Sequence, residues 1–353
     1  MTPPGHHLAA AEHLRHEVDS ALDAFLTGKE ASTAPQEPSP ADLIQAMRHL
    51  LAGGGKRLRP LLCACGWWAA GGDGLPPPVV QVAAALEMFH LAAMVHDDII
   101  DASDTRRGRQ TVHRWFTRKG TGPQFGANAA ILVGDLALIW SDELVHTAGL
   151  HDDRMRTVLT LTGLMRTEAL LGAYLELSAS GHLDTDVDAA LTVIRYKAAK
   201  YTVERPLHIG AALADAPHPL MEALTEFAIP LGEAFQLRDD LLGIYGDPDL
   251  TGKSNLDDLR EGKRTALVAL ALRQASGSQA ARLRSLIGNP ALSEEEADEA
   301  RTLMDTVGAI QGIEDMITDR YRQAIATLDR SPFPIPATTP LRRIAKAAVW
   351  RNR

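Results

Sequence analysis

The sequence predicts an all-α protein, a single large helical bundle around a central cavity. Ala and Leu recur through the 353 residues while aromatic residues make up only 5%, a mixture that favours helix over sheet. Apolar residues repeat with helical spacing over long stretches. Alternating runs of Val, Ile or Thr between turn residues are almost absent, so strands are not expected. Helices of this length can enclose a cavity.

The first predicted helix covers residues 8–27. Its apolar side consists of Leu8, Leu14, Val18, Leu22 and Leu26. Residues 28–40 are rich in Ala, Ser, Thr and Pro, which predicts a flexible linker. A short helix follows, capped by Ser39 before Pro40, and the Gly53–Gly55 run then breaks the chain. A helical pattern resumes over residues 57–70.

The prolines Pro76–Pro78 stop the preceding segment, and a long apolar helix is expected to begin just after them and to end near Ile100. Gly108 and Gly120–Gly122 then frame a loop. Further helices are expected over residues 124–147, 152–179, 186–214, 218–246, 257–275, 293–308 and 310–329. No linker follows residue 40, so the predicted organisation is an N-terminal helix and flexible linker, 1–40, and one all-helical domain, 41–353.

Composition excludes some classes of function. The formal net charge of −9 disfavours nucleic-acid binding, which needs a basic surface. Cys63 and Cys65 would point in different directions on a helix, so we expect two buried, unbridged thiols and a reducing compartment. The N-terminus lacks an apolar run typical of a signal peptide, and Glu87, His90 and Asp135 interrupt the most apolar stretches. We therefore predict a cytoplasmic protein without a transmembrane segment.

The first acidic cluster lies at the end of the long apolar helix. Asp97 and Asp101 are four residues apart and share a helix face, with Asp98 beside them. Carboxylates this close repel one another and call for a countercharge, for which a hard divalent cation such as Mg²⁺ is suited. A solvated acidic helix end is the alternative for this cluster taken alone.

A second acidic cluster makes that alternative weaker. Asp239 and Asp240 lie on another apolar helix, and Gln236 shares their face because it precedes them by three and four residues. Carboxylates on two facing helices can hold metal ions between them. The two clusters together therefore predict a metal site.

Basic residues supply a possible second half of the site. Lys56, Arg57 and Arg59 lie between a Gly-rich break and a helix start, which suits an anion. The other candidate cations are Arg106, Arg107, Lys197, Lys200, Lys253, Lys263 and Arg264. Each alone is compatible with an ordinary surface cation, but with two acidic clusters they predict a site for two diphosphates, one held through metal and one by cations.

These motifs resemble the trans-prenyl diphosphate synthase family, which includes farnesyl and geranylgeranyl diphosphate synthases. The matching segments, in the family's order, are Gly54–Pro60, His96–Gly108, Phe235–Asp240, Gly246–Pro248 and Thr251–Lys253. The match spans roughly residues 41–270. The run Lys200–Pro206 is most similar to actinobacterial geranylgeranyl-type members. The resemblance implies the isoprenoid synthase type of helical fold and a homodimer.

The resemblance also implies residue roles. Asp97, Asp98 and Asp101 would bind two magnesium ions on the allylic diphosphate, and Asp239, with Asp240 beside it, would hold a third. The residues implied to bind the diphosphate of isopentenyl diphosphate are Lys56, Arg59, His90 and Arg107. The residues implied around the allylic diphosphate are Arg106, Lys197, Gln236, Lys253 and Lys263. The implied catalytic set is Asp97, Asp98, Asp101, Asp239 and Lys197.

Two positions depart from the family pattern. Gly243 stands where many members carry a third aspartate of the second motif, which weakens the case for a full second metal cluster. Ala198 stands where a threonine commonly follows the lysine, so one hydroxyl contact to diphosphate is missing. Neither departure removes the acids and cations that the reaction requires.

Product length is expected to depend on the helix face before Asp97. Ala93 and Ala92 are small and leave the upper cavity open, whereas Phe89, eight residues before Asp97 and about 12 Å deeper, is the first large ring. We predict that Phe89 is the cavity floor and that the product is geranylgeranyl diphosphate, made from dimethylallyl, geranyl or farnesyl diphosphate. Phe89 as ordinary core packing is the alternative.

Three other functions remain open from the sequence. A farnesyl diphosphate synthase would perform the same reaction with a shorter product. A class I terpene cyclase would use aspartates and magnesium but no isopentenyl diphosphate, and Lys56, Arg59 and Arg107 disfavour it. A non-catalytic partner subunit would be expected to lose the metal aspartates, which this chain retains.

Overall fold

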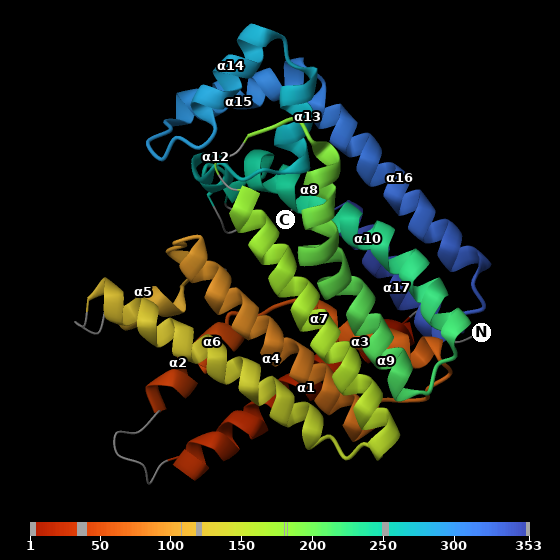
Figure 1. Ribbon diagram of the computed structural model, residues 1–353. Coiled ribbons are helices and arrows are strands. Elements are labelled where there is room, and N and C mark those ends of the chain that lie inside the picture. The colour runs from red at the N-terminus through yellow and green to blue at the C-terminus, as the bar shows by residue number, and fades with distance from the viewer. Residues whose placement is uncertain are drawn as a thin grey trace. The chain divides into compact units, whose positions relative to one another are not determined.

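The computed structural model describes residues 5–33, 41–106, 108–117, 122–179, 181, 183–248 and 254–350, with side chains from Glu12 onward. It confirms an all-α protein (Figure 1). The strands in the described ranges are β1 (Thr105–Arg106) and β2 (Arg109–Gln110), a short antiparallel pair. The chain divides into two compact units, residues 1–160 with 209–216 and residues 161–208 with 217–353.

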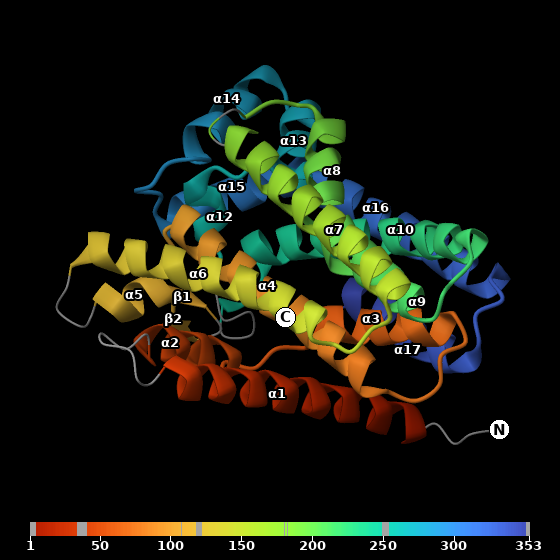
Figure 2. The ribbon, with the colours of Figure 1, turned by 60° about the horizontal axis from the view of Figure 1, so that its bottom comes forward.

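In the first unit, the long helix α4 forms the centre of the packing. Its helices are α1 (Gly5–Thr33), α2 (Ala41–Leu51), α3 (Leu58–Ala69), α4 (Pro77–Ile100), α5 (Val112–Phe116) and α6 (Pro123–His146). Helix α4 packs against α6, α3 and α1, and α4 and α6 run side by side in both ribbon views (Figures 1 and 2). Because α4 is covered on several sides, its apolar residues are buried almost all round.

Helix α4 has the length and apolar composition of a membrane span, alone among the described helices. However, 78% of its most apolar stretch is buried inside the protein. A core helix of this kind meets the same test of length and composition, so the burial of α4 accounts for its apolar sequence.

Helix α1 extends beyond the helix predicted over residues 8–27. It continues to Thr33, so the first part of the predicted linker is helical, while residues 34–40 lie outside the described ranges. The apolar side was predicted correctly where side chains are described, since Leu14, Val18, Leu22 and Leu26 are all buried. The added turns gain contacts near their end, because Arg48 donates to Glu30 and Lys29 to Glu143.

The second unit contains the remaining helices. They are α7 (Asp152–Ala179, whose first residues belong to the first unit), α8 (Val187–Ile194), the π-helix η2 (Arg195–Glu204), α9 (Arg205–Leu213, whose residues from Ile209 belong to the first unit), α10 (His218–Tyr245), α12 (Asp257–Glu261), α13 (Ala266–Gln274), α14 (Gly277–Leu286), α15 (Glu294–Thr306), α16 (Ala309–Arg330) and α17 (Ile335–Val349). Helix α10 packs against α16 and η2.

Some predicted helices are divided in the structure, and some helices of the structure were not predicted. The stretch 186–214 consists of α8, η2 and α9, and the stretch 257–275 is broken at Gly262, which takes the left-handed conformation that ends α12. Helices α5, α14 and α17 were not predicted. The predicted limits of α6, α7 and α10 agree with the structure to within one residue, whereas α4 begins at Pro77, inside the proline run that was expected to precede it.

The two cysteines lie on α3, buried and unbridged as predicted. Burial in apolar surroundings raises the pKa of the Cys63 thiol to about 12 and raises that of Cys65 as well. Both thiols therefore remain protonated and act as small apolar side chains.

Candidate functional site

The first acidic cluster lies at the carboxyl end of α4 in the first unit. Asp98 is buried, with 1% of its surface exposed, while Asp97 and Asp101 are half-buried. The β1–β2 hairpin that follows brings Arg106 back to the cluster, where its Nε donates to Asp98 Oδ1 at 2.6 Å. Arg106, predicted at the allylic diphosphate, therefore lies against the first acidic cluster.

Electrostatics couple Arg106 to the whole first cluster. Burial acts to lower the pKa of the guanidinium, but its hydrogen bond to Asp98 and the charges of Asp98, Asp97 and Asp101 together raise it. The guanidinium therefore lies in the negative field of all three carboxylates. Part of the acid charge is offset by Arg106, which leaves the cluster able to attract further positive charge.

The basic segment after Gly55 divides into two kinds of residue. Lys56 is exposed and Arg59 is half-buried. Arg57 is buried in the left-handed conformation, and its guanidinium donates to Glu87 at 2.8 Å and to Asp19 at 2.7 Å. Arg57 therefore holds the loop in place, while its neighbours Lys56 and Arg59 remain the candidates for anion binding.

The residues predicted to control product length lie along α4. Phe89 and Ala92 are buried, with 3% and 2% of their surfaces exposed. Ala93 and His90 are half-buried. Ala93 and Phe89 precede Asp97 by one and two helical turns, so the three side chains form one stripe on the helix.

The second acidic cluster lies on α10 in the second unit. Asp239 and Asp240 are half-buried, and the Gln236 amide donates to Asp240 Oδ1 at 2.9 Å. Burial raises the pKa of Asp240 to about 8, helped by the charges of Asp258, Asp239 and Glu176 and opposed by the Gln236 hydrogen bond. A carboxyl surrounded by other carboxylates in this way favours a bound cation.

Asp258 fills the space that Gly243 leaves open. A Cβ atom at position 243 would lie 2.0 Å from Asp258 Oδ2. The missing third acid of the second motif is therefore matched by a carboxylate from α12. Lys263 lies beside it, with Nζ 3.4 Å from Asp258 Oδ1 and 3.0 Å from Glu261. Asp258 was not predicted from the sequence, although the acid pair Asp257–Asp258 precedes Gly262 and Lys263 there.

The second unit also brings Lys197 to an acid that the sequence analysis missed. The Lys197 ammonium donates to Glu176 near the end of α7. Glu176 is close enough to Asp240 to help raise its pKa. Lys200, predicted on the same face as Lys197, also meets α7, but at Glu168, two helical turns earlier.

Two predicted residues, Arg107 and Lys253, lie outside the described ranges. Among the residues that are described, no three His, Cys, Asp or Glu side chains form a group that could hold a metal ion alone. Magnesium commonly binds through one or two carboxylates, with waters and substrate phosphate oxygens completing its shell. Taken separately, the carboxylates on α4 and those on α10 are oxygen donors of this kind, and each group fits magnesium bound together with a diphosphate.

An all-helical fold with acid pairs on long apolar helices and cations beside them fits an enzyme that handles diphosphates. The model of the polyprenyl synthetase family matches residues 40–304. The chain therefore belongs to the polyprenyl synthetase family, whose enzymes are prenyltransferases of isoprenoid biosynthesis. This confirms the family resemblance inferred from the motifs.

Individual relatives differ in product. The crystal structure of a geranylgeranyl pyrophosphate synthase from Corynebacterium glutamicum, complexed with isoprenyl diphosphate and magnesium, is 35% identical with a TM-score of 0.91, covering 97% of this chain and 99% of that one. A short chain isoprenyl diphosphate synthase of Methanocaldococcus jannaschii is 34% identical over 73% of this chain and 75% of its own. An all-trans-nonaprenyl-diphosphate synthase of Rhodobacter capsulatus is 31% identical over 88% and 93%.

Proposed function

We propose that this chain is a magnesium-dependent prenyltransferase that condenses isopentenyl diphosphate with an allylic diphosphate to give geranylgeranyl diphosphate. The observation that carries the proposal is the grouping in the second unit of Lys197, Gln236, Asp239, Asp240 and Lys263 with Glu176 and Asp258. These groups can bind a diphosphate and its metal ions. The family membership and the magnesium-bound relative from C. glutamicum support the same assignment.

The proposed metal ligands are Asp97, Asp98 and Asp101 for two ions, and Asp239 with Asp240 for a third. Bound magnesium supplies positive charge that stabilises a departing diphosphate. The allylic diphosphate is further held by Arg106, Lys197, Gln236, Lys253 and Lys263. Isopentenyl diphosphate is held by Lys56, Arg59, His90 and Arg107.

The reaction then follows from charge stabilisation. The allylic carbon–oxygen bond breaks, and its electron pair leaves with the diphosphate, whose charge the cations offset. The double bond of isopentenyl diphosphate attacks the allylic cation and forms the new carbon–carbon bond. The released diphosphate accepts the proton that the product loses. Apolar side chains such as Phe89 and Ala92 keep water from the cation.

A product assay tests the reaction. Purified protein is incubated with magnesium, isopentenyl diphosphate and, in parallel, dimethylallyl, geranyl or farnesyl diphosphate, and the products are identified by chromatography and mass. A twenty-carbon diphosphate is expected. A fifteen-carbon product would support the proposed reaction but contradict the prediction that Phe89 is the floor of the cavity. Conversion of an allylic diphosphate to a hydrocarbon, with isopentenyl diphosphate unused, would reject the proposal and indicate a cyclase.

The chain-length assignment depends on Phe89. Replacing the buried ring in Phe89→Ala opens space two turns before Asp97, so products longer than twenty carbons are expected. Leu86→Ala on the same helix is the matched control, since Leu86 is also buried and its loss tests general loosening of the core. An unchanged product spectrum in Phe89→Ala would show that another residue sets the length.

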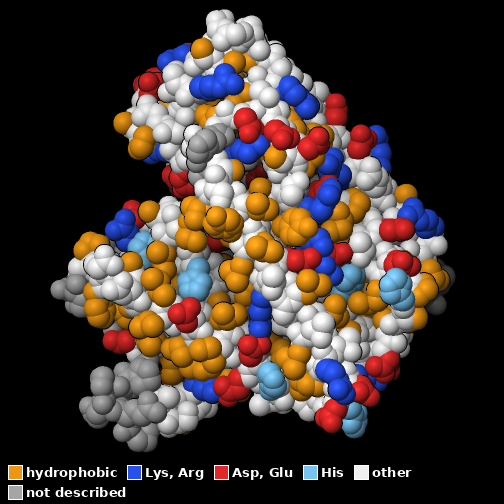
Figure 3. Space-filling view, in the orientation of Figure 1, with side chains coloured by type: hydrophobic (Ala, Val, Ile, Leu, Met, Phe, Trp, Pro, Cys, Tyr) orange, Lys and Arg blue, Asp and Glu red, His pale blue; other side chains and the backbone are white. Residues whose placement is uncertain are grey.

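We also propose a cytoplasmic homodimer. Large apolar side chains are exposed on α6 in the first unit and on α7 in the second, and such side chains are visible over both helices in Figure 3. They are Phe125, Ile131, Leu132 and Ile139 on α6, and Leu164, Leu170, Leu171, Tyr174, Leu175 and Leu177 on α7. Exposed apolar surface of this kind supports a protein interface. Light scattering is expected to give twice the chain mass, and a monomer would reject the dimer.

A further inference from the structure

The residues around Lys197 adopt a rare backbone conformation. The π-helix η2 runs for ten residues, Arg195–Glu204, between α8 and α9. Most π-helical segments are single turns inserted into α-helices, and they occur frequently at functional sites. Because its hydrogen bonds span one residue more than those of an α-helix, a π-helix is wider. The helices beside η2 must therefore leave it more room.

Two glycines provide that room, one from each neighbouring helix. A Cβ atom at Gly172 of α7 would lie 2.4 Å from the backbone nitrogen of Lys197 and 2.7 Å from its Cα. A Cβ atom at Gly232 of α10 would lie 2.4 Å from the Cα of Ala199. Both clashes are with the η2 backbone rather than with the flexible end of a side chain. Any larger residue at either position would therefore force η2 and that helix apart.

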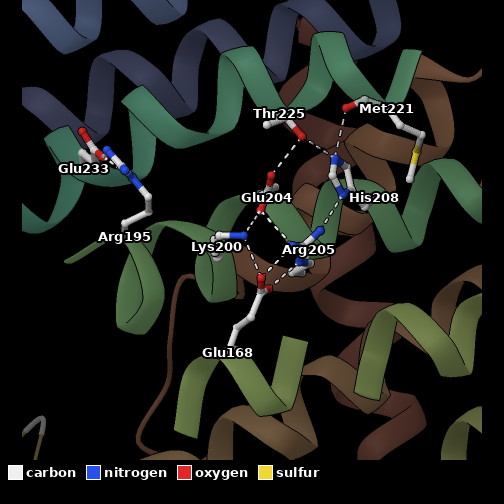
Figure 4. A network of polar contacts seen from close by, with 9 residues as sticks. All are labelled: Glu168, Arg195, Lys200, Glu204, Arg205, His208, Met221, Thr225 and Glu233. Atoms are coloured by element: carbon white, nitrogen blue, oxygen red, sulfur yellow. Dashed lines mark hydrogen bonds and ion pairs between the residues drawn. The ribbon is translucent and has the colours of Figure 1, made fainter. Parts of the chain in front are cut away.

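Charged side chains next to these glycines hold η2 in the same place. On α7, Gly172 is four residues from both Glu168 and Glu176, so the three share one helix face. Glu176 accepts from Lys197, and Glu168 accepts from Lys200 at 2.7 Å. Figure 4 shows the Glu168 contact.

On α10, the residue after Gly232 forms an ion pair with η2. Glu233 is buried and accepts from the Arg195 guanidinium at 2.8 and 2.9 Å, as Figure 4 also shows. Close backbone approach and an ion pair therefore occur together on both neighbouring helices. The start of η2, which carries Lys197, is fixed from both sides.

We propose that Gly172 and Gly232 are positioning residues for Lys197: they admit the wide η2 between α7 and α10, and Glu176 then fixes the Lys197 ammonium beside the second acidic cluster. This inference rests on the proposed function, in which Lys197 binds the allylic diphosphate. A displacement of η2 moves the ammonium with the backbone. Lys56 and Arg59, the predicted ligands of isopentenyl diphosphate, belong to the first unit, whereas η2, Gly172 and Gly232 belong to the second.

The test compares three alanine variants, Gly172→Ala, Gly232→Ala and Gly163→Ala. Gly163 is the matched control, because it lies on α7 and a Cβ atom there meets nothing within 4 Å. Initial rates are measured with geranyl diphosphate and isopentenyl diphosphate, each varied in turn. Calorimetry of inorganic diphosphate with magnesium gives a second measurement that needs no turnover.

Gly172→Ala and Gly232→Ala are expected to raise KM for geranyl diphosphate about tenfold or more, since displacements near 1 Å can cost up to about a hundredfold. Their KM for isopentenyl diphosphate should change less than about twofold, and diphosphate affinity should fall in parallel. Gly163→Ala should match the unaltered protein in all three quantities. If the glycine variants bind and convert geranyl diphosphate as Gly163→Ala does, the inference is wrong.

Circular dichroism shows whether the glycine variants fold. If they do not fold, the inference is tested with Glu176→Gln instead, because this variant keeps the side-chain shape and removes the charge that holds the Lys197 ammonium. A raised KM for geranyl diphosphate alone would support the inference, and an unchanged KM would overturn it. An unaltered protein that never consumes isopentenyl diphosphate would count against the proposed function, while the diphosphate calorimetry would still test the positioning.

Discussion

The buried ion pairs of Glu168 predict a large loss of stability when its charge is removed. Only 7% of Glu168 is exposed. Its carboxylate accepts from Arg205 at 2.6 and 2.8 Å and from Lys200 at 2.7 Å, as drawn in Figure 4. Burial acts to raise the pKa of Glu168, but the hydrogen bonds and charges of Arg205 and Lys200 lower it overall. The folded protein therefore holds Glu168 ionised between two cations.

In Glu168→Gln the shape of the side chain remains and the negative charge is lost. Breaking a buried ion pair costs about 3–5 kcal/mol, because the partner charge is left without compensation. Glu204 stays 3.7 Å from Lys200 and 3.5 Å from Arg205, which favours the lower end, about 3 kcal/mol. At about 2.1 cal/mol/K per residue, 353 residues unfolding as one unit have an unfolding entropy of about 0.74 kcal/mol/K. The expected fall in Tm is therefore about 4 °C.

Thermal unfolding followed by circular dichroism measures this shift. Glu299→Gln is the matched control, because Glu299 accepts from Arg282 at 2.8 and 2.5 Å in a similar pair that is open to solvent. Such an exposed pair is screened by water, so no measurable change is expected there. A shift below about 1 °C in Glu168→Gln, or one equal to the control, would refute the view that burial makes this network stabilising.

Two further predictions concern protonation and the second acidic cluster. Burial lowers the pKa of His208, so the folded protein keeps its ring neutral, while the unfolded chain takes up a proton below about pH 6.5; stability should therefore fall as the pH drops below that value. Between pH 7.5 and 5.5 the urea midpoint of His208→Gln should fall less than that of the unaltered protein. Equal falls in the two proteins would contradict this role of His208. Gly243→Ala places a Cβ atom 2.0 Å from Asp258 Oδ2 and must displace that carboxylate. The magnesium concentration for half-maximal activity should rise about tenfold, as is usual when a group beside a metal site is lost. An unchanged magnesium concentration for half-maximal activity would show that Asp258 has no part in metal binding.

The parts of the fold that follow local rules were predictable from the sequence. Helix α4 begins among consecutive prolines, and its mostly apolar sequence, with polar residues such as Glu87 and His90, continues to Ile100. Helix α14 was missed, although Ser276 and Gln279 form a capping box at its start. Its sequence is polar and has few apolar repeats, so periodicity alone gave no signal.

The site was predictable where acids cluster along one helix and not where they meet across helices. Asp97, Asp98 and Asp101 stand together in the sequence, so their common location follows from helical spacing. Asp258 reaches the second cluster only because residue 243 has no side chain, and Glu176 does so only because α7 lies against η2. Such contacts depend on packing between segments distant in the sequence, which one sequence does not specify.

The π-helix could not be predicted from local sequence, but the glycines on the neighbouring helices are informative. Residues 195–204 read as ordinary helix, because nothing in their composition separates a π-helix from an α-helix. By contrast, a glycine inside a long helix costs about 1 kcal/mol relative to alanine, so it calls for a packing reason. Gly172 and Gly232 each stand four residues before a polar residue of the second cluster, Glu176 and Gln236. On a helix this spacing puts close backbone contact one turn from a polar group, so such a pair indicates where a neighbouring backbone approaches a site.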